Sequence, residues 1–182
     1  YTACKSTAVQ LPEGKRCNTL TVTELFARPR ETLVIDIAKL KTHGMMGYSG
    51  AVKNLFGVVP GLLKPELHSR YPEKEPFAEM LVDLCEYVHP DFSIIDAIDA
   101  MEGDGPTGGQ KRFVGALVGS ESPYEADMVG AKLIDMKPEE ILVLKNAQEC
   151  GLCAGKLSEI KVLGDDFENI VVHDFKRARS SS

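Results

Sequence analysis

Hydrophobic and polar positions along the chain predict a series of strands and helices. Residues 33–38 (LVIDIA) and 92–98 (FSIIDAI) are short, nearly continuous apolar runs, which are typical of strands buried in a parallel sheet. Residues 112–119 (RFVGALVG) predict a third strand. Residues 2–9 and 16–23 alternate loosely around PEGK, and this pattern predicts a hairpin or two strands.

The clearest helix begins at Pro76 and ends before Pro90, because its apolar side chains fall on one face: Phe77, Leu81, Leu84, Cys85 and Val88. Ser122 has the features of a helix N-cap, with Pro123 in the first turn. That helix should run to about Ile134.

Three further helical segments are predicted. A helix over about 138–150 should be stopped by Gly151. Residues 39–50 (KLKTHGMMGYSG) predict a glycine-rich loop, and the segment after it, SGAVKNLFGVV, predicts a short helix with Ser49 as its N-cap. Residues 65–70 predict one more turn.

The order of these elements predicts an α/β fold with a mixed or mostly parallel sheet flanked by helices. Residues 159–163 (EIKVL) and 168–175 (ENIVVHDF) would supply two closing strands. We expect a single domain over 1–176 and a disordered tail over 177–182. Because the chain starts at Tyr1 rather than Met, we expect it to be part of a larger domain.

Composition indicates a cytoplasmic protein without a membrane segment. The longest apolar stretch, LFGVVPGLL, contains Pro60 and is far shorter than the roughly 20 residues that span a bilayer. We see no signal peptide. The cysteine count is odd, which favours a reducing compartment over a disulfide framework: Cys4, Cys17, Cys85, Cys150 and Cys153.

Charge is distributed unevenly along the chain. The formal net charge is −6, so nucleic acid is not an expected partner. Between Lys39 and Arg70, however, five lysine and arginine residues face one carboxylate, Glu66. This segment therefore carries +4 and the rest of the chain −10, which indicates a site for an anion.

The sequence EGDGPTGGQKR contains the pattern G-x-G-x-x-G at Gly103, Gly105 and Gly108. A dinucleotide-binding turn needs a helix directly after the glycines, and here a strand-like segment follows. Pro106 also removes a backbone donor from the loop. Two alternatives remain: a solvated turn whose glycines allow positive φ, or a loop that binds a ligand through Gly103, Gly105 and Gly109.

Acidic residues surround this loop: Asp96, Asp99, Glu102 and Asp104. Because ligands bind beyond the carboxyl ends of strands in open α/β sheets, the loop should share a crevice with the end of the preceding strand. Cations there would hold an anion: Lys39 and Lys41, with Thr42 beside them. Glu102 and Asp104 would bind a divalent metal or act as a base.

Two histidines, His43 and His68, are candidates for proton transfer, with Lys41 beside the first. Lys53 and Asn54 belong to the short predicted helix, whose N-terminal amides could also face an anion. Lys64 would share a face with His68. The alternatives are surface histidines and an amphipathic helix with ordinary surface charge.

Two other features have structural explanations. Asp127 lies in the first turns of a predicted helix, where the helix dipole favours a carboxylate. Cys150 and Cys153 form a C-x-x-C pair, but it follows a helix, where the dipole disfavours a thiolate. Since no second such pair exists, we expect no iron–sulfur cluster on this chain.

The segments KLKTHGMMGYSGAVKNLFGVVPG, FAEMLVDL, GDGPTGG and ADMVGAKL, with Lys64 and His68, resemble domain-of-unknown-function family 362 over about residues 30–165. The resemblance implies a bacterial or archaeal protein and further α/β sequence before this region. Some members carry a ferredoxin-like iron–sulfur module, which would make such a module a candidate partner. The resemblance implies no settled reaction.

Our leading hypothesis is a site for a small anionic molecule, a carboxylate or phosphate, with a divalent metal as candidate cofactor. Whether the protein is an enzyme stays open. The alternatives are an accessory domain of an iron–sulfur redox protein and a non-catalytic interaction domain.

Overall fold

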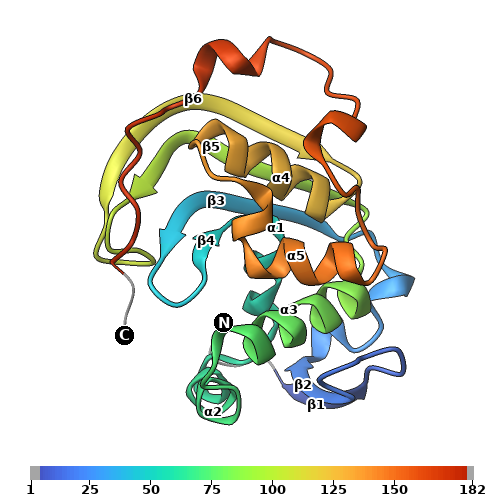
Figure 1. Ribbon diagram of the computed structural model, residues 1–182. Helices are drawn as coiled ribbons and strands as arrows, with labels where there is room; N and C mark the ends of the chain where they lie inside the picture. The colour runs from blue at the N-terminus through green and yellow to red at the C-terminus, as the bar shows by residue number, and fades with distance from the viewer. Residues whose placement is uncertain (1–4, 180–182) are drawn as a thin grey trace.

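The structure is a computed structural model that describes residues 5–179. Its centre is a four-stranded sheet in the order β4-β3-β5-β6 (Figure 1). These strands are β3 (Ile35–His43), β4 (Gly47–Ser49), β5 (Phe92–Glu102) and β6 (Gln110–Ser120). β3 and β5 are parallel, whereas β4 and β6 pair antiparallel with their neighbours. The fold is therefore α/β with a mixed sheet, as the sequence predicts.

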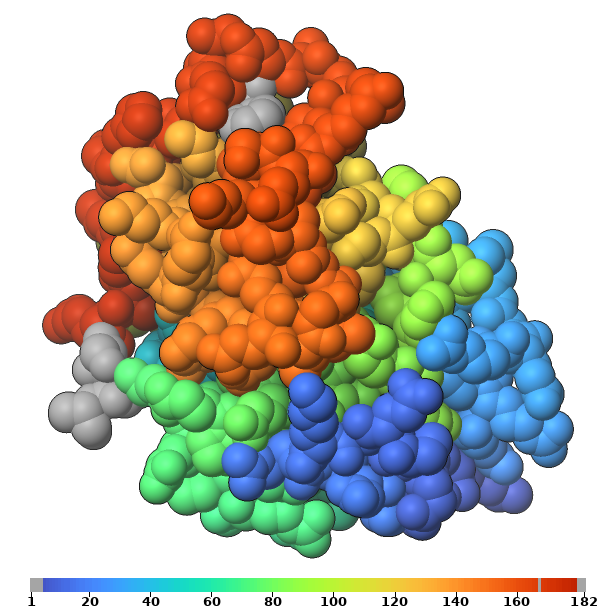
Figure 2. Space-filling view, turned by 45° about the vertical axis from the view of Figure 1, so that its right-hand side comes forward, coloured from blue at the N-terminus to red at the C-terminus, as the bar shows by residue number. Residues whose placement is uncertain are grey.

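A separate two-stranded sheet is formed by β1 (Ser6–Gln10) and β2 (Thr19–Thr23), which pair antiparallel. This confirms the predicted hairpin over the described residues; the start of its first strand, residues 2–4, lies outside them. In the space-filling view the blue hairpin lies below the orange helix α5 (Leu142–Glu149) (Figure 2).

Two helices, α1 (Ala51–Asn54) and α4 (Pro123–Leu133), pack directly against one face of the four-stranded sheet (Figure 1). On the side of these helices away from the sheet lie α3 (Lys74–Val88), which contacts α1, and α5, which contacts α4 and α3. The short helix α2 (Lys64–Arg70) lies away from the sheet. The remaining helical segments are short 3-10 turns at Glu24–Phe26, Pro29–Glu31, Leu55–Val58, Gly61–Leu63, Pro138–Glu140, Leu157–Glu159 and Phe167–Ile170.

The two long helices confirm their sequence signals. The apolar face predicted for α3 is buried, including Phe77, Leu81 and Leu84. At the start of α4 the Ser122 hydroxyl accepts the backbone N–H of Glu125, as its N-cap pattern predicts. Alternate residues of β3 point into the same core, because a strand turns successive side chains to opposite faces.

The glycine-rich loop predicted over residues 39–50 is wrong. β3 continues through His43, and after a turn the chain returns as β4, which pairs with Lys41–His43. The side chains of residues 39–43 (KLKTH) point alternately into the core and onto an open sheet face. A half-exposed strand of this kind is as rich in polar residues as a loop, and the sequence pattern therefore predicts a loop here. Ser49 lies in β4, and the residue before α1 is Gly50, without a side-chain cap.

The predicted closing strands are also wrong. Residues 159–163 and 168–175 form 3-10 turns and irregular chain, with no strand among the described residues after Ser120. The chain there runs past α4, where Val172 N–H donates to Leu133 O, instead of extending the sheet. Apolar residues thus contact the core from irregular chain, which composition alone does not distinguish from a strand.

The last described residues, 177–179, contact the rest of the chain: the Arg177 side chain donates to Asp135 O, and the Arg179 side chain donates to the Asp104 carboxylate. Residues 180–182 of the predicted tail lie outside the described part. The division into a domain over 1–176 and a tail stays a prediction. Within residues 5–179, no helix combines the length and the apolar character needed to cross a membrane.

Candidate functional site

Five basic side chains gather at the end of β3, and we call them the cationic cluster. Lys41 and His43 end the strand, Lys53 lies on α1, and α2 supplies Lys64 and His68. The sequence order places them within 28 residues, but only the β3–β4 hairpin and the turn into α2 bring them together in space.

The aromatic ring of Phe56 lies between the side chains from α1 and α2. The centre of this ring is 5.8 Å from Lys53 Nζ and 5.4 Å from Lys64 Nζ. His68 contacts the same ring edge-on at 5.8 Å and stacks on Phe77 at 4.6 Å. Because a cation over an aromatic face is attracted by the ring quadrupole, Phe56 helps to hold both ammonium groups near each other.

Burial, and after it the mutual repulsion of the basic side chains, lowers pKa values in the cationic cluster. The pKa of Lys53 is lowered to about 8, first by burial and then by the charges of Lys41 and Lys64. The pKa of His43 is lowered to about 3, first by burial and then by its basic neighbours Lys53, His68 and Lys41. The pKa of His68 is lowered by burial and by Lys53. Both histidines are therefore largely neutral at pH 7.

Among residues 5–179, the lysines of the cationic cluster have no acidic partner. Within residues 5–179, no carboxylate lies within 4.0 Å of the ammonium groups of Lys41, Lys53 or Lys64, whereas Lys39 pairs with Asp96 at 2.6 Å. The chain has 27 acidic residues and therefore offers many carboxylates that could have paired with these ammonium groups. An uncompensated and partly buried positive charge is costly, so this arrangement favours an anion.

His43 has a defined tautomer. Its Nδ1 accepts the backbone N–H of Met46 at 3.2 Å, and only 8% of the residue is exposed. Since the ring is neutral, the other nitrogen, Nε2, carries the proton and is a hydrogen-bond donor. His68 makes ring contacts only, so its nitrogens are free of such a constraint among the described residues.

A buried carboxylate, Asp127, holds α1 in place. Its oxygens accept the backbone N–H groups of Ala51 at 2.6 Å and Val52 at 3.0 Å, and the Tyr48 hydroxyl at 3.2 Å. Burial raises the pKa of Asp127 to about 7, although these hydrogen bonds lower it. The amides that could have faced a ligand are therefore occupied by a side chain from α4.

A second carboxylate, Asp36, holds the other end of α1. The Asn54 amide donates to Asp36 Oδ1 at 2.7 Å and to the Ile37 carbonyl at 3.1 Å. Burial raises the pKa of Asp36 to about 6. Asn54 is thus occupied by contacts to β3, and the helix that carries Lys53 is fixed at both ends.

The glycine loop after β5 lies beside the end of β3. The Thr42 hydroxyl donates to Gly103 O at 2.7 Å, and Gly44 N–H donates to Gly105 O at 3.0 Å. A Cβ on Gly105 would stand 2.0 Å from Thr42 O, so this close approach requires glycine. The two segments therefore share one rim of the sheet, as their order in the sequence predicts.

The acids of this rim face the C-terminal segment instead of the lysines. Glu102 accepts the backbone N–H of Lys176 at 3.1 Å, with Lys176 Nζ at 3.6 Å. Asp104 pairs with Arg179 at 2.7 Å. A Cβ on Gly109 would stand 2.5 Å from Glu102 O, so that glycine permits a tight backbone turn.

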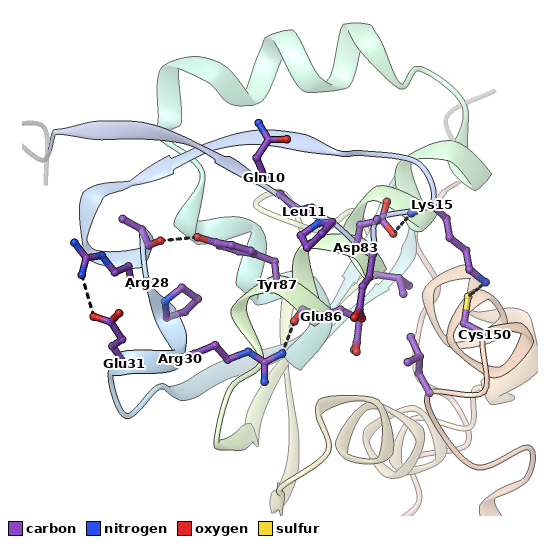
Figure 3. Close-up of a pocket in the computed structure, with 17 residues that line it drawn as sticks. Gln10, Leu11, Lys15, Arg28, Arg30, Glu31, Asp83, Glu86, Tyr87 and Cys150 are labelled. Carbon is purple, nitrogen blue, oxygen red and sulfur yellow. Dashed lines mark hydrogen bonds and ion pairs between the residues drawn. The ribbon is translucent and has the colours of Figure 1, made fainter.

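A cavity of about 510 Å³ lies between the hairpin turn, α3 and the end of α5, and no side chain of the cationic cluster lines it (Figure 3). There the Asp83 carboxylate accepts the N–H of Lys15, and the Lys15 ammonium lies 3.0 Å from Cys150 Sγ. The cationic cluster is instead a partly open surface.

Metal-binding groups and free thiols can be described for residues 5–179. Across residues 5–179, no group of three or more His, Cys, Asp or Glu side chains is arranged to hold a metal ion. Cys17 and Cys85 are buried free thiols, and Cys150 and Cys153 are partly exposed. Cys4 lies outside the described part of the chain.

Fold and site together define an α/β protein with a mixed sheet and a cationic cluster beside its central strands. The chain belongs to the family described as Domain of unknown function (DUF362), whose model matches residues 2–132. It is 37% identical over 121 residues to the thylakoid-associated protein sll1697 of Synechocystis sp. (strain ATCC 27184 / PCC 6803 / Kazusa). The match covers 66% of this chain and 38% of that protein. No solved structure matches the chain.

Proposed function

We propose that the cationic cluster binds a small anionic molecule carrying a carboxylate or phosphate group. The observation that carries this proposal is three lysines without an acidic partner among residues 5–179, in a chain of net charge −6. The pKa of Lys53 is lowered first by burial and then by the charges of Lys41 and Lys64, and a bound anion would offset both effects.

Within this proposal the side chains have different roles. Lys41, Lys53 and Lys64 contribute charge. His43 donates an N–H from Nε2, because its Nδ1 already accepts a hydrogen bond. His68 is the better candidate for accepting a proton, since neither ring nitrogen is committed among the described residues.

Other residues predicted as ligands would position the site and would not contact the anion. Asn54 and Thr42 fix α1 and the glycine loop, and Gly105 permits the close approach between loop and strand. Lys39 is paired with Asp96, and Glu102 and Asp104 with the C-terminal segment. A metal on those two acids would have to displace Lys176 and Arg179.

Isothermal titration with sodium sulfate and sodium phosphate tests the proposal. We expect saturable binding to the wild-type protein and at least about tenfold weaker binding to Lys53→Met, which keeps the aliphatic stem but removes the charge. Lys145→Met is the matched control, because Lys145 lies on α5 near Glu149. Equal affinities for the two variants would overturn the proposal.

The location of the protein is also a proposal. The odd cysteine number favours a reducing compartment and therefore the cytoplasm. The relative from Synechocystis is described as thylakoid-associated, and peripheral attachment to a membrane is the alternative for this chain. Fractionation of cells into soluble and membrane pools, with a salt wash of the membranes, would separate the two.

A further inference from the structure

The cavity of about 510 Å³ beside the β1–β2 turn lies apart from the cationic cluster (Figure 3). We call it the hairpin cavity. It is lined by residues 10–15 of the hairpin turn, by residues 27–31, and by side chains of α3 and of the turn after α5. Small-molecule sites are usually concave, largely pre-formed and about 300–1,000 Å³ in volume. The hairpin cavity therefore has the size of a second site, and its walls and lining indicate what it could hold.

Three residues of α3 hold the walls of the hairpin cavity in place. The Asp83 carboxylate accepts three successive backbone N–H groups of the hairpin turn, those of residues 15–17, at 2.9, 2.8 and 2.8 Å. The Tyr87 hydroxyl donates to a main-chain carbonyl of the segment after β2 at 2.8 Å. The Glu86 carbonyl accepts the Arg30 guanidinium at 3.1 Å. Because both irregular walls are bound to one helix, the cavity is pre-formed.

Apolar side chains form part of the lining. Leu11, Pro29 and Val82 are buried side chains that reach the cavity, and Leu152 beside them is partly exposed. Tyr87 contributes its ring, because its hydroxyl is bound to the main chain. A ligand would therefore gain free energy by burying an apolar body against these groups.

Three exposed side chains of the lining have unused hydrogen-bond donors. Among residues 5–179, no carboxylate lies within 4.0 Å of the Lys15 ammonium or the Arg30 guanidinium. The Lys15 ammonium contacts the Cys150 sulfur at 3.0 Å. The Gln10 side chain accepts a hydrogen bond from Thr19, and its N–H groups make no hydrogen bond within the described chain.

Most carboxylates of the lining already accept hydrogen bonds. Glu31 pairs with an arginine at 3.3 Å, and the Glu86 carboxylate accepts the Tyr124 hydroxyl at 2.7 Å. Asp83 is occupied by the hairpin turn. In the described part of the chain, Glu13 is the one lining carboxylate without such a bond. Unused donors therefore outnumber unused acceptors, and a ligand with an anionic group would supply the missing acceptors.

We propose that the hairpin cavity binds a small molecule with an apolar body and an anionic group, the body against the apolar lining and the anion at the Lys15 ammonium. Charge-assisted hydrogen bonds from Lys15 orient the anion. Lys15 is the better anchor because Arg30 already holds a wall of the cavity. The hairpin cavity shares no side chain with the cationic cluster, so this site and the proposed function can fail independently.

Fluorescence titration with anilinonaphthalene sulfonate tests the inference on the full chain, because this dye joins aromatic rings to a sulfonate. We expect saturable binding with a dissociation constant on the order of 10–100 μM. Lys15→Met should weaken binding at least about fivefold, whereas Lys15→Arg, which keeps the charge, should bind within about twofold of the wild type. Lys145→Met is the control and should bind like the wild type, because Lys145 lies on α5 outside the lining.

Alkylation of the wild-type protein by iodoacetamide locates the dye, since Cys150 lines the hairpin cavity and Cys153, which is also partly exposed, does not. Saturating dye should slow alkylation of Cys150 at least about fivefold and leave Cys153 unchanged, as mass spectrometry of peptides would show.

Three results would each overturn the proposal. The first is a wild-type protein that binds no dye saturably. The second is bound dye that leaves the alkylation of Cys150 unchanged, because the dye would then lie on another surface. The third is a Lys15→Met variant, folded by circular dichroism, that binds the dye as tightly as the wild type.

Discussion

Lys53 is the residue whose chemistry ties the cationic cluster to its surroundings. Its ammonium group is partly buried, has no carboxylate within 4.0 Å among residues 5–179, and has a pKa of about 8. The lowered pKa means that the protonated form of Lys53 is less strongly favoured than on an exposed lysine, although it still predominates at pH 7. A bound anion would raise this pKa, so binding and protonation must be coupled.

The coupling predicts how affinity depends on pH. Because only protonated Lys53 attracts an anion, sulfate affinity should fall as pH rises from 7 to 9.5, with the steepest change near pH 8 to 9. Sulfate is the suitable probe because it does not titrate in this range. At pH 8, titration in buffers of different ionisation enthalpy should show uptake of roughly half a proton. A sulfate affinity that does not change across this range would contradict the role of Lys53.

Asp127 is the second residue with a measurable signature. Its pKa in the folded protein is about 7, above the ordinary 3.8 of an unfolded chain. The folded state therefore holds this proton more tightly, and the stability that Asp127 contributes is highest below pH 4 and is lost as pH rises to about 7.

Asp127→Asn removes this dependence, since an amide does not titrate. The free energy of unfolding of the wild type, relative to the variant, should decrease by about 1 kcal/mol per pH unit between pH 4.5 and 6.5. Denaturant titrations at four pH values measure it. Asp36 titrates in both proteins, and because its charge also raises the pKa of Asp127, only the part of its titration that is independent of Asp127 cancels in the difference. Parallel pH curves for the two proteins would refute the assignment.

Among the elements, α1 is only four residues long and depends on contacts from other parts of the chain. Asp127 of α4 binds its first amides, and Asp36 of β3 binds Asn54 at its end. Gly50 lies at the centre of this arrangement, because a Cβ there would stand 2.1 Å from Asp127 Oδ1. The position of Lys53 therefore depends on α4 and β3 as much as on α1 itself.

Gly50→Ala should consequently destabilise the protein by about 1–3 kcal/mol, because the added methyl group displaces the Asp127 carboxylate. It should also weaken sulfate binding. Gly57→Ala is the matched control in the same segment, since a Cβ there meets nothing within 4 Å. Chemical denaturation and sulfate titration of both variants provide the measurement. A Gly50→Ala protein as stable as Gly57→Ala would contradict the clamping of α1.

Sequence patterns are sufficient for elements whose signals are local. Ser122 with Pro123 marks the start of α4, and the apolar period from Phe77 marks α3. Such patterns do not identify residues 39–43 as the end of β3, because the outward side chains Lys39 and Lys41 are polar and lie on an open sheet face. The uneven charge along the chain is sufficient to indicate the residues of the cationic cluster, because all five lie in one basic segment.

Contacts between distant segments are not predictable from these patterns. Asp127 caps a helix some 75 residues earlier in the chain, and no local pattern at Gly50 signals a cap. Likewise, Glu102 and Asp104 contact Lys176 and Arg179 across more than 70 residues. A carboxylate in a sequence does not reveal which cation neutralises it, so charge alone does not pair these acids with Lys41.

For the whole molecule, the cationic cluster stands out because the chain is acidic overall, with a formal net charge of −6. The family model covers residues 2–132 and therefore includes all five side chains of the cationic cluster. The match to the Synechocystis relative covers 38% of that protein, so the chain spans less than half of its length.

The most direct measurement is a crystal structure with bound selenate, a sulfate analogue whose selenium atom is located by anomalous scattering. The account predicts a selenate ion in contact with at least two of the three ammonium groups of Lys41, Lys53 and Lys64, and its absence in crystals of Lys53→Met. Selenate bound elsewhere, with these lysines free of any anion, would contradict the account.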